Sequence, residues 1–284
     1  MYKAKYLLVY SIQDPAGINI AENLRNLEYF DKIHVEKINS RLVGLFYNSN
    51  YDSYLASFKD DIIFIDYVDQ YFDVEYYIYL SRHSSIKRIK SLTVHFTGNL
   101  SNEKLYGANP RELSKTYPPL AKAIIAHISK ITVERHVREY EVVYEATHHG
   151  PTNLSKPLVF VEIGSTISEW RNRKVAEIIA EAILKALADI NSRKHIQCLG
   201  AIGVGGGHYS GKHTRYCLHS DVCYSHIFSK HVLNMLSYDI LEQALNKTMH
   251  PVKYIIIEKK GVKSSQRKIV ESFAANMGLS IKYI

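Results

Sequence analysis

The chain has 284 residues, of which 46% are hydrophobic and 23% charged, and this composition predicts a globular protein with a sizeable core. Its formal net charge of +8 favours an anionic partner, while the dispersed basic residues exclude a histone-like tail. No low-complexity tract or obvious repeat interrupts the sequence, so we expect one domain over residues 1–284.

The cysteines and the apolar runs indicate the cellular compartment. Cys198, Cys217 and Cys223 are odd in number and lack Cys-x-x-Cys spacing, which argues against a disulfide scaffold and a zinc ribbon. The N-terminal apolar run is too short for a signal peptide, and no stretch approaches the ~20 apolar residues of a membrane helix. We therefore expect reduced thiols, a cytoplasmic location and no membrane partner.

Short apolar runs alternate with helical patterns along the chain, which is typical of a layered α/β fold. Asp14 before Pro15 predicts the N-cap and first turn of a helix that continues to about Asn26. Apolar residues at helical spacing predict further helices over 119–136, 170–190, 236–245 and 266–277. Buried strands are predicted at 6–10, 43–47, 62–65, 158–162, 197–203 and 254–257.

Polar segments follow several of these strands. They are 82–85 (Arg-His-Ser-Ser), 93–99, 147–152 (Thr-His-His-Gly-Pro-Thr) and the glycine-rich segment 203–214. Because ligands bind at the carboxyl ends of strands in open α/β sheets, we expect these segments to form one shared site. Their histidines suit metal binding or proton transfer near neutral pH.

The glycine-rich segment has only partial likeness to phosphate-binding loops. Its spacing resembles a P-loop, but His213 stands where Ser or Thr must bind magnesium, and no good helical pattern follows. A dinucleotide site is excluded because a third glycine is missing in register. We predict instead that Gly205, Gly206 and Gly207 offer backbone N–H groups to an oxyanion or phosphate beside His208.

Each candidate histidine also has a purely structural interpretation. His83 and His95 could be partly buried core residues. Adjacent side chains of an extended segment point in opposite directions, so at most one of His148 and His149 is expected to face a given ligand. The surrounding threonines and glycine nevertheless favour a role for at least one of them in the site.

Glu162 ends a predicted apolar strand, where a carboxylate usually needs a partner. Three roles are open for it: a metal ligand, a general base, or the acceptor of an ion pair with Arg82 or Arg171. Trp170 is expected to pack at the base of its helix and not to stack on a substrate.

Basic residues recur beside these motifs, including Lys212 and Arg215 after the glycines and five more within 259–268. Solvated faces explain most charge clusters. Here the charges adjoin the predicted site, so we infer a substrate that carries phosphate.

Together with 162–170 and 251–264, these segments resemble the archaeal and plant type of D-aminoacyl-tRNA deacylase, from about residue 5 to the C-terminus. The resemblance implies a zinc-dependent monomer that hydrolyses the ester between a D-amino acid and the 3′ end of tRNA, which recycles tRNA and guards translation against wrong chirality. It also implies a three-layer α/β/α fold with a mixed sheet, of the phosphorylase/hydrolase-like class and related in shape to peptidyl-tRNA hydrolase.

The residues and the resemblance give a hypothesis for each role. We predict one or two zinc ions, bound by imidazoles drawn from His83, His95, His148, His149 and His208. The predicted catalytic residues are His83, His148, His208 and Glu162. Substrate and tRNA binding are assigned to Gly205, Gly206, Gly207, Lys212, His213, Arg215, Ser84 and Thr97.

Two other functions are considered. A zinc-dependent peptidase or amidase on small substrates could use the same residues, since related folds carry that chemistry. A non-catalytic RNA-binding module would use the basic faces alone, but it leaves the histidines and glycines without a purpose.

Overall fold

A computed structural model of the chain describes residues 1–34, 41–192 and 198–284. The larger sheet contains β1 (Tyr2–Ser11), β2 (Asp31–Lys32), β3 (Leu42–Asn48), β4 (Ser53–Phe58), β5 (Phe72–Ser84), β6 (Ser91–His95), β9 (Glu141–Tyr144) and β10 (Leu158–Ser165). Its eight strands are mixed in direction and follow the order β2-β3-β4-β1-β5-β10-β6-β9. A short pair, β7 (Gly98–Asn99) and β8 (Glu112–Leu113), lies outside it.

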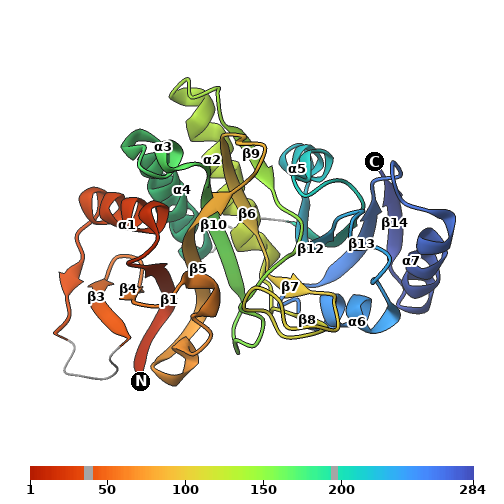
Figure 1. Ribbon diagram of the computed structural model, residues 1–284, viewed down its shortest axis with the longest axis horizontal. Helices are drawn as coiled ribbons and strands as arrows, with labels where there is room; N and C mark the ends of the chain where they lie inside the picture. Colours follow the sequence, from red (N-terminus) through yellow and green to blue (C-terminus); the bar gives the residue numbers. More distant parts are fainter. Residues whose placement is uncertain (35–40, 193–197) are drawn as a thin grey trace.

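A smaller sheet has the order β12-β11-β13-β14 and is parallel throughout. Its strands are β11 (Leu199–Val204), β12 (Val222–Phe228), β13 (Val252–Ile257) and β14 (Ser280–Tyr283). Figure 1 shows the two sheets side by side, with the chain termini at opposite ends of the molecule.

The helices are α1 (Pro15–Leu27), α2 (Pro118–Glu134), α3 (Ile167–Trp170), α4 (Arg173–Asn191), α5 (Gly211–Leu218), α6 (Tyr238–Asn246) and α7 (Ser264–Asn276), with 3-10 helices η1 (Ile62–Phe64) and η2 (Val68–Gln70). Helices α1, α2 and α4 pack on one face of the larger sheet (Figure 1). Elements η1 and η2 cover part of the other face, and α6 and α7 pack on the smaller sheet. Within the described parts of the chain, no helix has the length and apolar content needed to span a bilayer.

Helix α1 illustrates how the sequence determines the packing. The Asp14 carboxylate accepts hydrogen bonds from the N–H groups of Ala16 and Gly17, as an N-cap does. A Cβ on Gly17 would lie 2.5 Å from the Leu80 carbonyl oxygen, so only glycine lets the helix pack this closely on β5. The predicted start of this helix is therefore confirmed.

The predicted mixed α/β fold with helices layered on a mixed sheet is confirmed, although its strands are divided between two sheets. One apolar core contains residues of both, such as Val161 and Tyr224. This shared core favours the single domain expected over residues 1–284, which stays a prediction.

Several predicted elements differ from the structure. The run 62–65 is not a strand but the short helix η1, capped by Asp61. The helix predicted over 170–190 begins later, as α4 at Arg173, because Trp170 ends the short helix α3 and Asn172 caps α4. An eight-residue helix, α5, does follow the glycines, where none was predicted. Of the strand predicted over 197–203, residue 197 lies outside the described residues and β11 begins at Leu199.

The expectation of reduced thiols is wrong for two of the cysteines. Cys198 and Cys223 form a disulfide, while Cys217 is free and buried. Strands β11 and β12 are parallel neighbours with Gly200 opposite Cys223, so Cys198 lies beside the second cysteine. Cysteine number and spacing carry no information about this pairing, because it depends on the order of strands in the sheet.

Replacing Cys223 by serine is expected to lower the free energy of unfolding. The disulfide closes a segment with a sequence separation of 25 residues, and the chain-entropy model gives about 3.5 kcal/mol for a loop of this length. Urea unfolding with and without reductant measures the effect. Cys217→Ser is the control and keeps the dependence on reductant; a wild-type midpoint that reductant leaves unchanged would contradict the prediction.

Candidate active site

The central strands of the larger sheet place three polar side chains on one face. Glu162 in β10 lies opposite Ser81 in β5 and Thr93 in β6. Since side chains two residues apart in a strand share a face, His83 and His95 point to the same side as Glu162. This face is opposite to the one covered by α1, α2 and α4.

The site lies across this face and not along one edge. Strand β6 runs antiparallel to β10, so His83, the next-to-last residue of β5, lies at the level of Gly164, whereas His95 ends β6 at the level of Phe160. His95 therefore reaches the same site from a strand that runs in the opposite direction. Long side chains on a shared face bring these residues together.

The segment 145–150 covers this face and is fastened on both sides. The N–H of Ala146 donates to the His208 carbonyl (2.8 Å), and the N–H of Thr147 donates to Ile227 in β12 (2.8 Å). On the other side, the N–H of Gly98 donates to the His149 carbonyl (2.9 Å). The segment thus brings its own histidines and His208 over the larger sheet.

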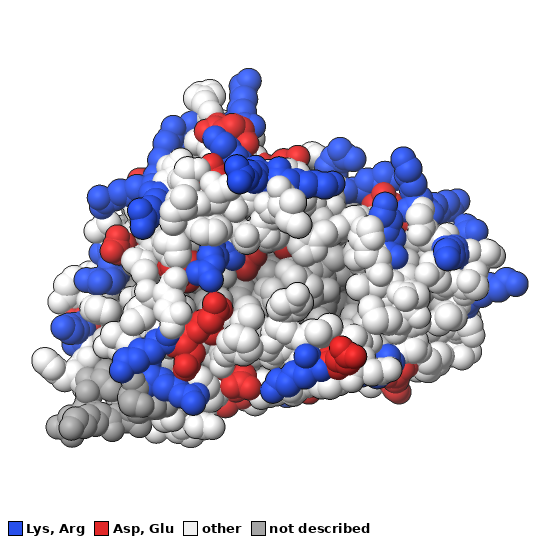
Figure 2. Space-filling view, in the orientation of Figure 1, with Lys and Arg blue, Asp and Glu red and all other residues white. Residues whose placement is uncertain are grey.

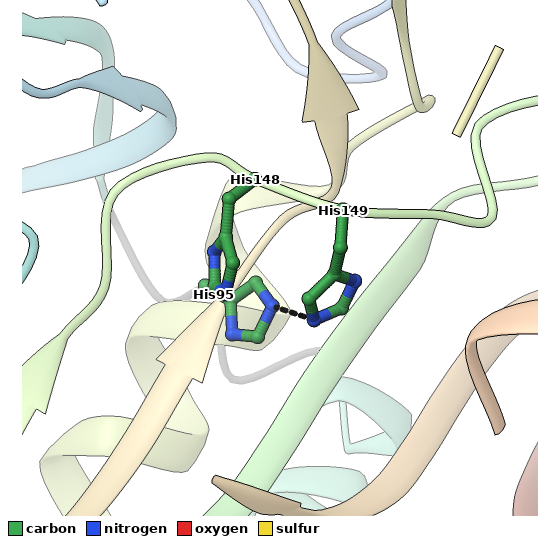
Figure 3. A group of neighbouring side chains, drawn as sticks. All are labelled: His95, His148 and His149. Atoms are coloured by element: carbon green, nitrogen blue, oxygen red, sulfur yellow. Dashed lines mark hydrogen bonds between the residues drawn. The ribbon is translucent and has the colours of Figure 1, made fainter. Parts of the chain in front are cut away.

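His95, His148 and His149 form an imidazole trio (Figure 3). The Nε2 atoms of His95 and His149 are 3.1 Å apart, and the ring centroids of His95 and His148 are 4.4 Å apart. Nδ1 of His148 donates to the Ala146 carbonyl (2.8 Å) and Nδ1 of His149 to the Gly150 carbonyl (2.7 Å). In the neutral rings, both Nε2 atoms therefore carry lone pairs, the arrangement typical of metal-binding histidines.

The expectation that at most one of His148 and His149 faces a ligand is wrong. His149 has a φ of 37°, in the left-handed region, so the segment is not extended and its side chains do not alternate. Burial lowers the pKa of His148 well below the usual value and that of His149 to about 4. Both rings are neutral at neutral pH, as metal binding requires.

A buried carboxylate, Glu145, joins the other histidines. Its Oε1 is 3.0 Å from His83 Nδ1, and its Oε2 is 2.8 Å from His208 Nε2 and 3.6 Å from His148 Nε2. Glu162 Oε2 is 3.5 Å from His83 Nδ1. We call these two glutamates, His83, His208 and the trio the histidine–glutamate cluster.

The cluster holds charges of both signs out of water. Burial alone would lower the pKa of His83, but hydrogen bonds to Glu145 and Glu162 outweigh it and raise the pKa to about 11. Burial likewise raises the pKa of Glu145, yet its bonds to His208 and His83 hold it well below the usual range. Burial dominates at Glu162 and raises its pKa to about 7.

The donor set of the cluster fits a metal such as zinc. The trio is one possible group of ligands, and His83, Glu145 and His208 are another. Imidazole nitrogens and carboxylate oxygens are ligands that Zn²⁺ prefers. Among the described residues, nothing accepts or donates a hydrogen bond at His83 Nε2 or His95 Nδ1, although both atoms are buried, and such atoms are rare without a ligand or water.

The cluster opens into a cavity of about 330 Å³, which we call the acidic cavity. Its walls include Asp14, Asp61, Ile63 and Arg82 in addition to His83. Figure 2 shows that this side of the molecule is hollowed near its middle, in front of the central strands.

Sequence reasoning missed Glu145. It is the one charged residue within 142–147, directly before His148 and His149. A charge in such a run needs a partner, and this signal could have identified it. Asp14 was predicted only as a helix cap, but it also accepts from the Arg82 N–H (2.9 Å) and lines the acidic cavity.

Two predicted substrate-binding residues are buried and have structural roles. The Thr97 hydroxyl donates to the Pro151 carbonyl, which anchors the segment that carries the trio. The His213 ring is fully buried and packs edge-on against Tyr224, with centroids 5.0 Å apart. Neither side chain is accessible to tRNA, so both assignments are corrected.

The glycines of the predicted nest are not equivalent. The N–H of Gly205 donates to the Phe228 carbonyl (2.8 Å), so it cannot serve an oxyanion. Gly205 and Gly206 have φ values of 95° and 80°, which favour glycine, and a Cβ on Gly205 would lie 2.5 Å from the Glu258 carbonyl oxygen. These glycines build the turn that presents His208.

The remaining predicted residues are accessible or support the site. Ser84 and Arg215 are exposed, and Lys212 is 3.7 Å from Glu258. Arg82 pairs with Asp61 (3.3 Å) instead of Glu162. Trp170 packs against the apolar core at the end of α3, as expected, and its Nε1 donates to the His83 carbonyl (3.0 Å).

Comparisons with known proteins identify the family. A family described as D-aminoacyl-tRNA deacylase matches residues 70–282. Relatives with that name include those of Staphylothermus marinus (41% identical; 98% of this chain and 99% of the relative), Hyperthermus butylicus (40%; 97% and 98%) and Archaeoglobus fulgidus (34%; 97% and 95%).

A crystal structure described as a conserved protein of unknown function is 32% identical, with a TM-score of 0.88, and the match covers 100% of this chain and 96% of that chain. The expected enzyme class, a hydrolase that acts on ester bonds, is confirmed by these relatives. By its sequence over nearly the full length, the chain belongs to the D-aminoacyl-tRNA deacylase family.

Proposed function

We propose that this chain hydrolyses the ester bond between a D-amino acid and the 3′ end of tRNA at the histidine–glutamate cluster. The observation that carries the proposal is the convergence of imidazoles and buried carboxylates from separate segments on the floor of one cavity. Water adds to the ester carbonyl, the bond to the ribose oxygen breaks, and that oxygen receives a proton. The products are a free D-amino acid and tRNA.

We propose that the imidazole trio holds a zinc ion, and that His83, Glu145 and His208 serve proton transfer beside it. The neutral Nε2 atoms of the trio and the carbonyl bonds behind two of its rings support the zinc site. When bound, zinc supplies a water of lowered pKa, about 7, for attack on the ester.

His83 is the residue we assign to the leaving oxygen. Its Nδ1 is held by Glu145 (3.0 Å) and Glu162 (3.5 Å), and its ring lines the cavity. The buried Nε2 has no partner among the described residues, so it can donate a proton to a bound oxygen. General acid catalysis of this kind contributes about 10²–10⁴-fold to the rate.

Of the three predicted backbone donors to the oxyanion, two remain. Since Gly205 is already bonded, we assign the stabilisation of the oxyanion to the N–H groups of Gly206 and Gly207, next to His208. We further propose that the enzyme acts on tRNA in the cytoplasm as a monomer, because one chain supplies every residue of the site.

Release of tyrosine from D-tyrosyl-tRNA is expected, with much slower release from L-tyrosyl-tRNA. Dialysis against a chelator should abolish the activity and zinc should restore it. The assay follows labelled tyrosine, with a D-tyrosine amide as the test for an amidase. Equal rates on both enantiomers, or faster cleavage of the amide, would refute the proposal.

His149→Ala is expected to lower the zinc content, because it removes one ligand of the trio. Metal analysis of the purified protein measures this directly. His127→Ala is the control, since His127 pairs with Asp189 (2.7 Å) and lies on α2, which packs on the opposite face of the larger sheet. Full zinc content in the His149 variant would exclude the trio as the zinc site.

Glu145→Gln is expected to lower kcat by about 10²-fold or more while the circular dichroism spectrum is retained. The amide keeps the shape of the side chain but removes the charge that His83 and His208 face. Glu141→Gln, at an exposed position of β9, is the matched control. Wild-type kcat in the Glu145 variant would show that the carboxylate has no catalytic role.

A further inference from the structure

A second cavity, of about 560 Å³, adjoins the acidic cavity. On one side it is bounded by the segment 83–89, and on the other by 207–209 with Lys230 and His231. His83, Ser84 and His208 line both cavities. These three residues therefore form a shared wall, and the cluster lies at this wall.

The two cavities differ in charge. The acidic cavity has the carboxylates of Asp14, Asp61 and Glu162 in its walls. Its guanidinium, Arg82, is paired with Asp61, and the His83 ring, which is common to both cavities, is paired with Glu145 and Glu162. The second cavity has the ammonium groups of Lys87 and Lys230, and none of its lining residues, all of them described, is acidic. We call it the basic cavity.

The substrate has the same division of charge. On one side of its ester bond is an amino acid with a positive α-ammonium group. On the other side is an adenosine whose 5′ phosphate, and those before it, are negative. An ester placed at the shared wall would thus have each half in a cavity of opposite charge.

We propose that the acidic cavity binds the D-aminoacyl group and the basic cavity binds the terminal adenosine of tRNA. This inference rests on the deacylation proposed above and names the two halves of its site. The α-ammonium group faces the carboxylates of Asp61 and Glu162, and the amino-acid side chain contacts Ile63. The 5′ phosphate of the adenosine faces Lys87 and Lys230.

The walls of the basic cavity suit a nucleoside. Ile86 and Ile89 give it an apolar side for the base, and Ile86 is fully exposed. The Tyr209 ring lies against His83, with centroids 5.4 Å apart, and its buried hydroxyl has no partner among the described residues. Unpaired bases are bound by stacking and by hydrogen bonds of this kind.

A basic path continues from this cavity toward the preceding phosphates. The stem of Lys230 packs over Gly261, where a Cβ would lie 3.0 Å from Lys230 Cδ. The exposed Lys259 and Lys260 are in the same turn. Figure 2 shows Lys and Arg side chains along the upper and right-hand borders of this view. The 3′ strand of tRNA can follow these charges into the cavity.

The roles of the two cavities are tested with one probe and two variants. Adenosine 5′-monophosphate is titrated into the full-length protein by calorimetry, which needs no catalysis. We expect the Lys87→Ala/Lys230→Ala variant to weaken this binding at least tenfold and to raise KM for D-tyrosyl-tRNA with little change in kcat. Lys3→Ala/Lys130→Ala removes the same charge at exposed positions elsewhere and is the control.

The second variant, Ile63→Trp, fills the acidic cavity. It is expected to lower kcat/KM for D-tyrosyl-tRNA at least tenfold while binding of the monophosphate is unchanged. If the lysine variant binds the monophosphate like wild type, or if Ile63→Trp weakens that binding equally, the assignment is overturned. Inorganic phosphate that binds as tightly as the nucleotide would also overturn it, because the cavity would then select only an anion.

These outcomes are independent of the proposed function. If the wild-type enzyme deacylates D-tyrosyl-tRNA but the two variants do not affect the two ligands differently, the proposed function stands and the assignment of the two cavities is wrong. If the wild-type enzyme deacylates neither enantiomer, the proposed function is wrong, whether or not the monophosphate binds.

Discussion

The buried carboxylate of Glu145 is the constraint on which the site depends. A charge in such surroundings costs several kcal/mol unless it is paired and hydrogen-bonded. Here it is paired by His83 from β5 and by His208 from the turn after β11. These partners come from different sheets, so the carboxylate can be buried only when the two sheets are correctly docked. The site therefore forms only when the two sheets are packed together.

The backbone around Glu145 also links the two sheets. The segment 145–150 bonds to His208 and to Ile227 on the side of the smaller sheet and to Gly98 on the other. The left-handed φ of 37° at His149 then turns both adjacent rings toward the sheet face. A non-glycine residue held in this conformation costs about 1 kcal/mol or more, which neighbouring contacts must offset. The position of the trio thus follows from hydrogen bonds of the backbone as much as from side-chain chemistry.

Local patterns were enough to predict most elements and most members of the site. Asp14 and Pro15 predict the start of α1, and clustered histidines without apolar periodicity point to His83, His148 and His208. Apart from the omission of Glu145, the main errors depend on strand order or backbone conformation. The disulfide of Cys198 requires β11 beside β12, and the burial of His213 requires α5 to pack inward. A single sequence has no local signal for either arrangement.

The glycines after β11 lie beside the site, as their sequence suggests, but their main role differs from the predicted one. Three glycines beside a histidine suggest a cradle of N–H groups, and that interpretation assumes that the groups are free. In the fold, the N–H of Gly205 closes the turn onto Phe228, and the lack of a Cβ lets the turn approach Glu258. The consequence is a rigid support that holds His208 2.8 Å from Glu145. The glycines therefore act first by placing the histidine, and any direct contact with the reacting oxygen falls to the two residues nearest to it.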